Sequence, residues 1–325
     1  MKKFTSAIMA LMLLALFSEL HSQQIMTPRV SPAAEVSQTI GFSKISVTYS
    51  RPSVQGRQVW GNLVKYGMEP NEFGNKKAMP WRAGANENTT VTFSDDVTIK
   101  GKPLKAGKYG LHMIPAESGE WTIIFSKDNQ AWGSFFYEES NDALRVQASP
   151  EKSHFEEWLT YGFDQIKPAS ARLFMHWENL RIGVTCEFDE PSITLYNITA
   201  QLTGAPGFSW QNWNQAALYA LQTSRFLDKA EGWIKRSVSI NENVNNRNLL
   251  GYVLMAGGKT DEAMKIFREN IERYSDNWNV YDSYAEALAQ TGDNKGAIEY
   301  FEKALSMAPE GQKKRIQKAI DDLKK

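Results

Sequence analysis

The spacing of apolar residues changes once along this 325-residue chain, close to position 190. Before that point, short segments alternate apolar and polar residues, as in KISVTYS (44–50), where Ile45, Val47 and Tyr49 share one face. After it, apolar residues recur every three or four positions, the period of a helix. We therefore expect an α+β multidomain protein, with an antiparallel β-sandwich followed by an all-α helical repeat domain.

The first half holds a series of short segments rich in Val, Ile, Thr and aromatic residues, separated by Gly, Pro, Asn or Asp. This pattern is typical of a β-sandwich. Two residues, Glu178 and Asn179, separate the last two segments, which predicts a tight hairpin there. Residues 51–82 lack alternation and predict a long loop, whose aromatic and Arg content argues against disorder.

The second half begins with a segment that has Pro191 at its start and Gly204 at its end, as helices prefer. An internal repeat follows. Its members Gly251, Leu254, Gly258, Ala263 and Phe267 recur 34 positions later as Ala285, Leu288, Gly292, Ala297 and Phe301. A weaker earlier copy includes Ala217 and Ala230, and residues 312–325 predict an amphipathic helix that caps the stack.

The N-terminus has a short positive region at Lys2–Lys3, an apolar run over 7–17 and a polar stretch to Ser22. This predicts a cleaved signal peptide over 1–22, a β domain over 23–190 and a helical domain over 191–325. We expect a periplasmic or secreted protein without a membrane span. No Cys stands directly after the apolar run, so a lipoprotein is disfavoured. The chain has a single cysteine, Cys186, which allows no intramolecular disulfide.

Two stretches of the chain resemble known families. VSQTIGFSKISVTYSRPSVQGRQVWGNLV (36–64), PWRAGANENTTVTFSDDV (80–97), ALRV and HWE occur in order and resemble the DUF2911 family of exported bacterial proteins. That resemblance covers roughly residues 28–188 and implies a fold and a compartment, but no reaction. TGDNKGAIEYFEKALSMAP (291–309) resembles the tetratricopeptide repeat, which implies contact with a protein partner.

Aromatic, basic and amide side chains gather in and beside the long loop. The set consists of Tyr49, Arg51, Arg57, Trp60, Trp81, Arg82, Asn86 and Glu87. Guanidinium groups pair with carboxylates and phosphates, and indole rings stack on cations, so these residues fit a ligand-binding pocket. They equally fit a structural network in which Arg82 pairs with Glu87, Asn86 holds a turn and the tryptophans fill the end of the sandwich. Both interpretations stay open.

Other chemistry finds little support in the sequence. His112, His176 and Glu178 could bind a metal if their strands were neighbours, but no H-E-x-x-H or close His pair is present, and His154 is expected at the surface. We expect no metal and no cofactor. The chain has 37 basic and 37 acidic residues, so its net charge attracts neither nucleic acid nor an anionic membrane.

The leading hypothesis is therefore a non-enzymatic exported binding protein. Its β domain would hold a small polar ligand or an envelope component, and its repeats a protein partner. The candidate partner-binding residues are Asn214, Arg247, Asn248, Asn279 and Asp282. The alternative is a hydrolase of glycan or peptidoglycan that uses Glu87 or Asp95 as acid/base. A third possibility is a structural spacer whose long loop is packed shut.

Overall fold

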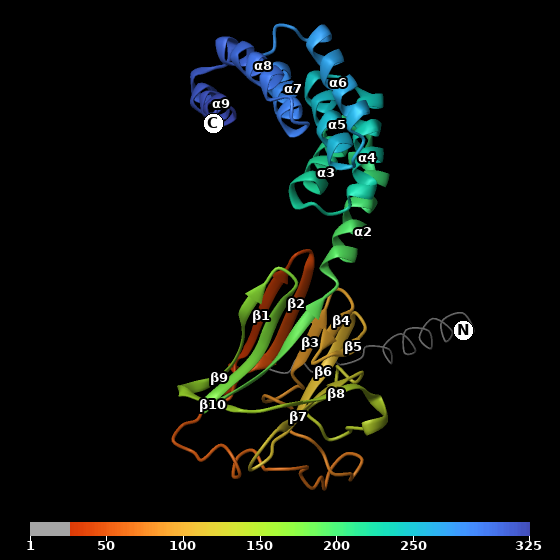
Figure 1. The fold of residues 1–325 in the computed structure, drawn as a ribbon. Helices are drawn as coiled ribbons and strands as arrows, with labels where there is room; N and C mark the ends of the chain where they lie inside the picture. Colours follow the sequence, from red (N-terminus) through yellow and green to blue (C-terminus); the bar gives the residue numbers. More distant parts are fainter. Residues whose placement is uncertain (1–26) are drawn as a thin grey trace, which may run out of the picture. The chain divides into compact units, whose positions relative to one another are not determined.

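The computed structural model describes residues 27–325, which divide into two compact units, one ending at Phe188 and one spanning Asp189–Lys325 (Figure 1). The predicted signal peptide, residues 1–22, lies outside the described residues. Within residues 27–325, no helix combines the length and apolar character needed to cross a membrane.

The first unit consists of two antiparallel sheets. The six-stranded sheet has the order β1 (Ala33–Ile40), β2 (Ser43–Ser50), β3 (Thr90–Phe93), β6 (Gly107–Ile114), β7 (Trp121–Ser126), β8 (Asp142–Ala148). The four-stranded sheet has the order β5 (Lys102–Leu104), β4 (Val97–Ile99), β10 (Ser170–Phe188), β9 (Glu151–Lys167). The predicted antiparallel β-sandwich is confirmed. A short 3-10 helix, η1 (Glu139–Asn141), precedes β8.

Strand alternation builds the core of this unit. In β2, Ile45 and Val47 are fully buried while Lys44 is exposed. Trp121 in β7 and Trp177 in β10 are among the largest fully buried side chains. Burying an aromatic side chain removes a large apolar area from water, so these residues contribute much of the stability of the sandwich.

The predicted hairpin at Glu178–Asn179 is wrong. The chain runs through this point as one strand, β10, over 19 residues. Glu178 has a φ of +55°, and the register with β9 shifts on both sides of it. The two residues therefore form part of an irregular, bulged strand pair and not a turn, because the long neighbour β9 continues alongside.

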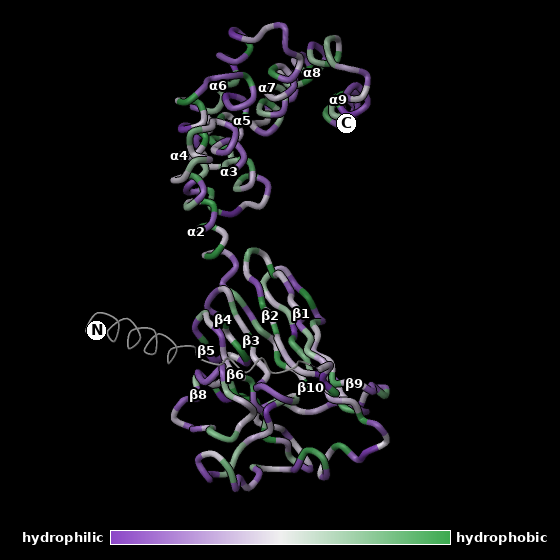
Figure 2. Tube along the Cα trace, turned by 180° about the vertical axis from the view of Figure 1, so that it is seen from behind, coloured by the Kyte–Doolittle hydropathy of each residue, from purple (hydrophilic) through white to green (hydrophobic). Residues whose placement is uncertain are grey.

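The second unit is all helical. Its helices are α2 (Glu190–Thr203), η2 (Ala205–Phe208), α3 (Trp210–Thr223), α4 (Leu227–Ile240), α5 (Val244–Ala256), α6 (Thr260–Arg273), α7 (Trp278–Gln290), α8 (Asn294–Met307) and α9 (Glu310–Leu323). Consecutive pairs α3–α4, α5–α6 and α7–α8 pack closely, and α9 packs on α8. This is the predicted helical repeat. Figure 2 shows apolar and polar residues intermixed along these helices, as an amphipathic stack requires.

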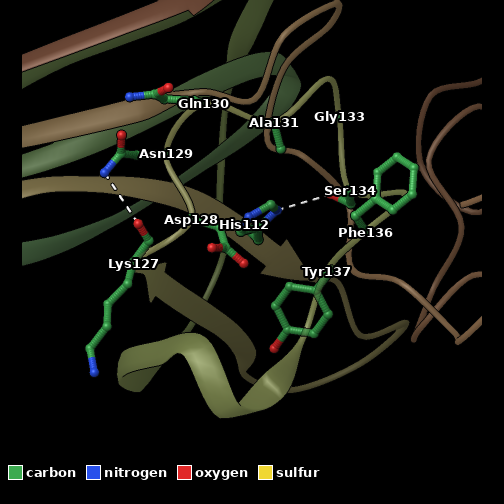
Figure 3. A pocket seen from close by; sticks show the side chains of 10 residues that line it. All are labelled: His112, Lys127, Asp128, Asn129, Gln130, Ala131, Gly133, Ser134, Phe136 and Tyr137. Atoms are coloured by element: carbon green, nitrogen blue, oxygen red, sulfur yellow. Dashed lines mark hydrogen bonds between the residues drawn. The ribbon is translucent and has the colours of Figure 1, made fainter. Parts of the chain in front are cut away.

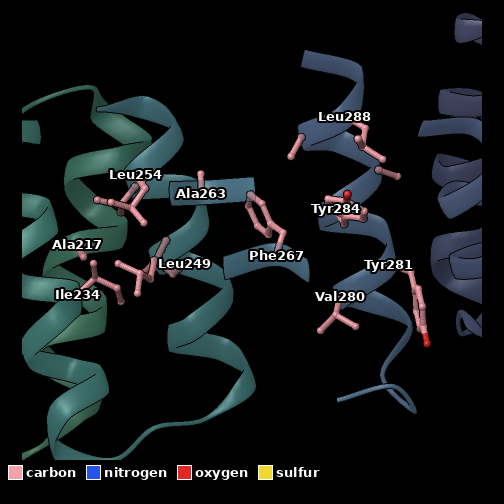
Figure 4. Close-up of a cluster of buried hydrophobic side chains, with 14 of the residues drawn as sticks. Ala217, Ile234, Leu249, Leu254, Ala263, Phe267, Val280, Tyr281, Tyr284 and Leu288 are labelled. Atoms are coloured by element: carbon pink, nitrogen blue, oxygen red, sulfur yellow. The ribbon is translucent and has the colours of Figure 1, made fainter. Parts of the chain in front are cut away.

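Small residues at the contacts allow the paired helices to pack closely. Ala217, Gly251 and Ala285 hold equivalent positions in α3, α5 and α7. Both alanines are fully buried, and a Cβ placed on Gly251 would lie 2.5 Å from the Phe267 ring. Figure 4 shows Phe267 with Leu249, Leu254 and Leu288, which belong to one apolar cluster of this unit.

Candidate functional site

The long loop between β2 and β3 is fastened to β9 by its first residues. Arg51 Nε donates to the carbonyl of Leu159 at 2.9 Å, and its terminal nitrogen donates to Thr160 Oγ1 at 2.6 Å. Tyr49 Oη accepts from the backbone N–H of Tyr161 at 3.2 Å. Both hydrogen-bonding groups are thus engaged with β9, which places Arg51 and Tyr49 in a structural role.

Tryptophan side chains form a packed cluster at this end of the sandwich. Trp81 stacks on Trp177 with ring centroids 6.2 Å apart and planes 16° apart. Trp60 meets Trp81, Trp121 and Trp177 edge to face at 5.7, 5.0 and 5.8 Å. The Nε1 atoms of Trp60 and Trp177 are buried and find no hydrogen-bond partner among residues 27–325. Trp81 is only 9% exposed, so its ring belongs to the core.

Arg82 and Glu87 are not partners, contrary to the structural interpretation of the sequence. Glu87 accepts two hydrogen bonds from Arg29, at 2.7 and 2.8 Å, in an exposed ion pair. Arg82 donates to the carbonyl of Asn86 at 2.9 Å and lies over the Phe135 ring at 5.3 Å. Asn86 itself has a φ of +59°, so the expected turn role fits its left-handed conformation.

The Arg82 guanidinium lacks a carboxylate partner within salt-bridge distance among residues 27–325. Burial lowers its pKa, and the more distant charge of Glu69 opposes that shift. A cavity of about 350 Å³ opens beside it, with Arg57, Trp81 and Asn86 also in its wall. Arg57 is held by the carbonyls of Ser53 and Val54.

A second cavity, of about 610 Å³, contains residues that the sequence analysis did not connect (Figure 3). His112 from β6 and Ser134 from the 127–137 loop are both buried, with His112 Nδ1 2.9 Å from Ser134 Oγ. Ser134 also lines the cavity beside Arg82, so it lies on the wall of both. A Cβ on the adjacent Gly133 would lie 2.6 Å from the Arg82 guanidinium carbon, so a larger residue there would displace the guanidinium, and the φ of +70° also favours glycine.

The electrostatics of this pair favour binding over proton transfer. Burial, aided by the charge of Arg82, lowers the pKa of His112 to about 4, so the imidazole is neutral at pH 7. A general base works best with a pKa near the operating pH. Tyr137 packs edge-on to the imidazole, and its hydroxyl donates to Asp142 at 2.7 Å. Burial and Asp142 raise the pKa of Tyr137, so the phenol stays protonated.

The carboxylates of the hydrolase hypothesis lie elsewhere. Glu87 precedes β3 and Asp95 follows it, and neither lines the cavity beside Arg82. Asp95 accepts a hydrogen bond from Ser94 at 2.6 Å. The premise of the sequence-based metal hypothesis is also wrong, because β6 with His112 and β10 with His176 belong to different sheets.

The candidate partner-binding residues lie on the first helices of the pairs. Arg247 and Asn248 of α5 and Asp282 of α7 are buried. Arg247 donates hydrogen bonds to Asn270 and Glu269. Asn248 donates to Ser283 at 2.8 Å. Asp282 forms an ion pair with Arg315 at 2.5 Å. Asn279 is half-buried beside the Asn277 cap of α7.

Three of these residues share one structural position. Asn214, Asn248 and Asp282 are spaced by 34 residues and stand in α3, α5 and α7. In each of them, Oδ1 is buried and has no hydrogen-bond partner within the described part of the chain. Buried acceptors are normally satisfied, so a repeated unsatisfied acceptor requires an explanation.

Comparison with known proteins gives two family matches. Residues 31–186 match the family described as "Protein of unknown function (DUF2911)". These residues form a DUF2911 domain. Residues 279–310, which span α7 and α8, match the tetratricopeptide repeat. Both recognised resemblances are confirmed. No curated protein matches the chain.

Similar solved structures include the type III secretion translocator chaperone SycD of Yersinia enterocolitica, at 16% identity and a TM-score of 0.32, covering 35% of this chain and 91% of SycD. PcrH from Pseudomonas aeruginosa has 16% identity and a TM-score of 0.33; the match covers 36% of this chain and 92% of PcrH. A thermophilic TPR protein of Thermus thermophilus has 16% identity and a TM-score of 0.35; the match covers 40% of this chain and 70% of that protein.

The DUF2911 domain therefore brings together part of the predicted set. Trp81, Arg82, Asn86 and Arg57 share one cavity, whereas Glu87 and Tyr49 line a separate cavity of about 400 Å³ beside Arg29. His112 and Ser134 were missed as a pair because 22 residues separate them and no short motif joins them. Only the pairing of β6 with its neighbours and the path of the 127–137 loop bring them into contact.

Proposed function

We propose that this protein is an exported, non-enzymatic binding protein. In this proposal the DUF2911 domain holds a small ligand with an anionic group, and the tetratricopeptide repeats bind a protein partner. The observation that carries the ligand proposal is the half-buried Arg82 guanidinium, which lines a cavity and makes no salt bridge within residues 27–325, although Glu69 stands in the wall of the same cavity.

The cost of that arrangement supports a ligand. A charge that leaves water without a paired counter-charge is unfavourable, and here burial lowers the pKa of Arg82. A carboxylate or phosphate group accepts two parallel hydrogen bonds from a guanidinium, which neutral ligands do not match. Arg57 in the same wall adds a second positive charge, and Glu69 there adds one negative charge, so the wall is positive on balance. A small anionic ligand would supply the missing partner.

The protein-partner proposal rests on the helical unit. Tetratricopeptide repeats are a scaffold for protein–protein contact, and the unsatisfied acceptors of Asn214, Asn248 and Asp282 recur along the first helices. Hydrogen-bond donors of a bound segment, arriving directly or through bridging water, would satisfy such a series. The burial of these oxygen atoms means that neighbouring side chains have to shift when a partner binds.

Two rival functions have less support. Glycan hydrolysis by Glu87 or Asp95 needs two carboxylates around one substrate bond, yet Glu87 is held by Arg29 and neither residue lines the cavity beside Arg82. A structural spacer would have its long loop packed shut, whereas cavities of about 350 and 610 Å³ adjoin this loop and its neighbour. Export follows from the predicted signal peptide and remains part of the proposal.

Ligand binding to the full chain tests the proposal. Wild-type protein, Arg82→Gln and Arg172→Gln are titrated with a panel of carboxylated and phosphorylated sugars and peptides, using tryptophan fluorescence as readout. Arg172 is the matched control, because it is outside the cavity and pairs with Glu151. We expect an anionic ligand whose affinity falls about tenfold or more in Arg82→Gln alone, the loss expected for a charged hydrogen bond. A panel that leaves the fluorescence unchanged, or equal effects in the two variants, refutes the ligand proposal.

A further inference from the structure

Three side chains on the β9–β10 edge form a cluster separate from the cavities described above. They are His154 and Glu156 of β9 and His176 of β10. One potential ligand atom of each lies within 4.8 Å of those of the other two. His154 and Glu156 are two residues apart on a strand, so their side chains leave the same side. His154 is exposed, Glu156 half-buried and His176 buried.

The irregular register of this strand pair brings the three together. From His176 to Glu178, β10 advances two residues while β9 advances four, from Thr160 to Glu156. The same mismatch recurs between Glu178 and Leu180. Extra residues in one strand bend it and redirect its side chains, and such bulges are over-represented beside functional sites. In a regular ladder continued from the His176–Thr160 pair, Glu156 would lie opposite Leu180 and His154 still further from His176.

The hydrogen bond of His176 leaves one of its nitrogens free for a metal. Nε2 lies 2.9 Å from the carbonyl oxygen of His154. A carbonyl only accepts, so Nε2 carries the proton and Nδ1 has the free lone pair. A hydrogen bond from the second ring nitrogen to a backbone carbonyl is the usual support of a metal-binding histidine. The His154 and His176 rings are 4.6 Å apart, edge to face.

Glu156 is also available. Within residues 27–325 its carboxylate pairs with no basic side chain. By contrast, the neighbouring acids Glu151 and Asp164 of the same strand are paired with Arg172 and Arg181. A free carboxylate beside two imidazoles concentrates metal-binding atoms at one point of the edge.

We propose that His154, Glu156 and His176 bind a zinc ion. Two imidazoles and a carboxylate are a donor set that zinc accepts at about 2.0–2.2 Å, with a fourth position left for water. Ligands of a tetrahedral ion at that distance are about 3.3 Å apart, so separations within 4.8 Å have to close by at most about 1.5 Å. Rotation of the exposed His154 and of Glu156 supplies this movement. The site departs from the expectation that the chain binds no metal, which considered His112 in place of His154.

Zinc titration of the untagged full chain by isothermal calorimetry tests this inference. We expect one equivalent to bind, with affinity reduced at least about tenfold in His154→Ala and in Glu156→Gln. Glu187→Gln is the matched control, since this exposed carboxylate lies further along β10, opposite Thr98 and outside the cluster. Its affinity should equal that of the wild type.

Because His154 is exposed and Glu156 only half-buried, both can be changed without opening the core, whereas His176 is buried. Far-ultraviolet circular dichroism checks that each variant is folded. A wild-type chain that takes up no zinc overturns the proposal, and so does equal binding by Glu156→Gln and Glu187→Gln.

Discussion

At the scale of single residues, the neutral state of His112 is the property that most affects the candidate site. The imidazole is buried against Ser134 and lies within the influence of the Arg82 charge, so protonation is unfavourable in the folded chain. A neutral imidazole accepts or donates a hydrogen bond without adding positive charge. The positive charge beside the cavities therefore comes from arginine and lysine, such as Arg82 and Lys127, and it persists over the whole physiological pH range.

The lowered pKa of His112 predicts a loss of stability in acid. The unfolded chain takes up this proton near pH 6.5, the folded chain only near pH 4, so the unfolded state binds more protons between these values. The free energy of unfolding should fall by about 2 kcal/mol more in wild type than in His112→Gln when the pH is lowered from 7 to 5. Urea unfolding at the two pH values measures this, and equal losses in both proteins would contradict it.

The sequence predicted part of the site for reasons that operate at this scale. Trp81, Arg82 and Asn86 are close in the chain, so their types and spacing already indicated a polar turn beside aromatic rings. The partner of Glu87 was missed because Arg29 is 58 residues away and no local pattern joins them. The same holds for His154 and His176, whose contact depends on the register of two long strands.

At the scale of elements, close helix contact in the repeats depends on small residues. Gly251 of α5 faces the ring of Phe267 in α6, and its equivalents Ala217 and Ala285 are fully buried in the other pairs. The 34-residue spacing revealed these contacts in the sequence because each repeat buries the same positions. The bulged β9–β10 pair had no such signal, since alternation alone does not distinguish an irregular strand from two strands joined by a turn.

Adding one methyl group should have opposite effects at two helical glycines. In Gly251→Ala the new Cβ would lie 2.5 Å from the buried Phe267 ring, so we expect the helical unit to lose about 1–3 kcal/mol. In Gly232→Ala of α4, no heavy atom lies within 4 Å of the new Cβ, and the better helix former should add up to about 1 kcal/mol.

Urea unfolding followed by circular dichroism at a helix-sensitive wavelength compares these two variants with the wild type. A stable Gly251→Ala protein would mean that α5 and α6 pack less closely than described. Destabilisation by both alanines would instead indicate that the helices are sensitive to any substitution. The clash with Phe267 would then not explain the effect at Gly251.

At the scale of the whole molecule, two separately packed units carry the two proposed binding activities. The buried cluster of the helical unit runs from Leu202 to Ile320 and contains no residue of the DUF2911 domain. Each unit thus has its own core, and each proposed site is built within one unit. The sequence predicted this division from the change of apolar period alone.

Substitutions in one unit should therefore leave the activity of the other unchanged. The double variant Asn214→Ala/Asn248→Ala should lose co-purification of a protein partner from the native envelope while keeping wild-type ligand affinity. Arg82→Gln should show the reverse. Asn197→Ala in α2 is the control for the helical unit, because its side chain binds only its own helix. A single variant that abolishes both activities would contradict separate sites.

At two places β9 has two more residues than β10 between paired positions. These irregularities have an effect besides bringing His154, Glu156 and His176 together. β9 is the outermost strand of its sheet, and a straight strand of 17 residues there would expose a long row of backbone groups to another polypeptide. The bends interrupt that row, and Ser53 bridges to Trp158 in the bent region. The kinks thus protect the chain against strand-to-strand self-association, so deletions that straighten β9 should convert a dispersed protein into an aggregating one.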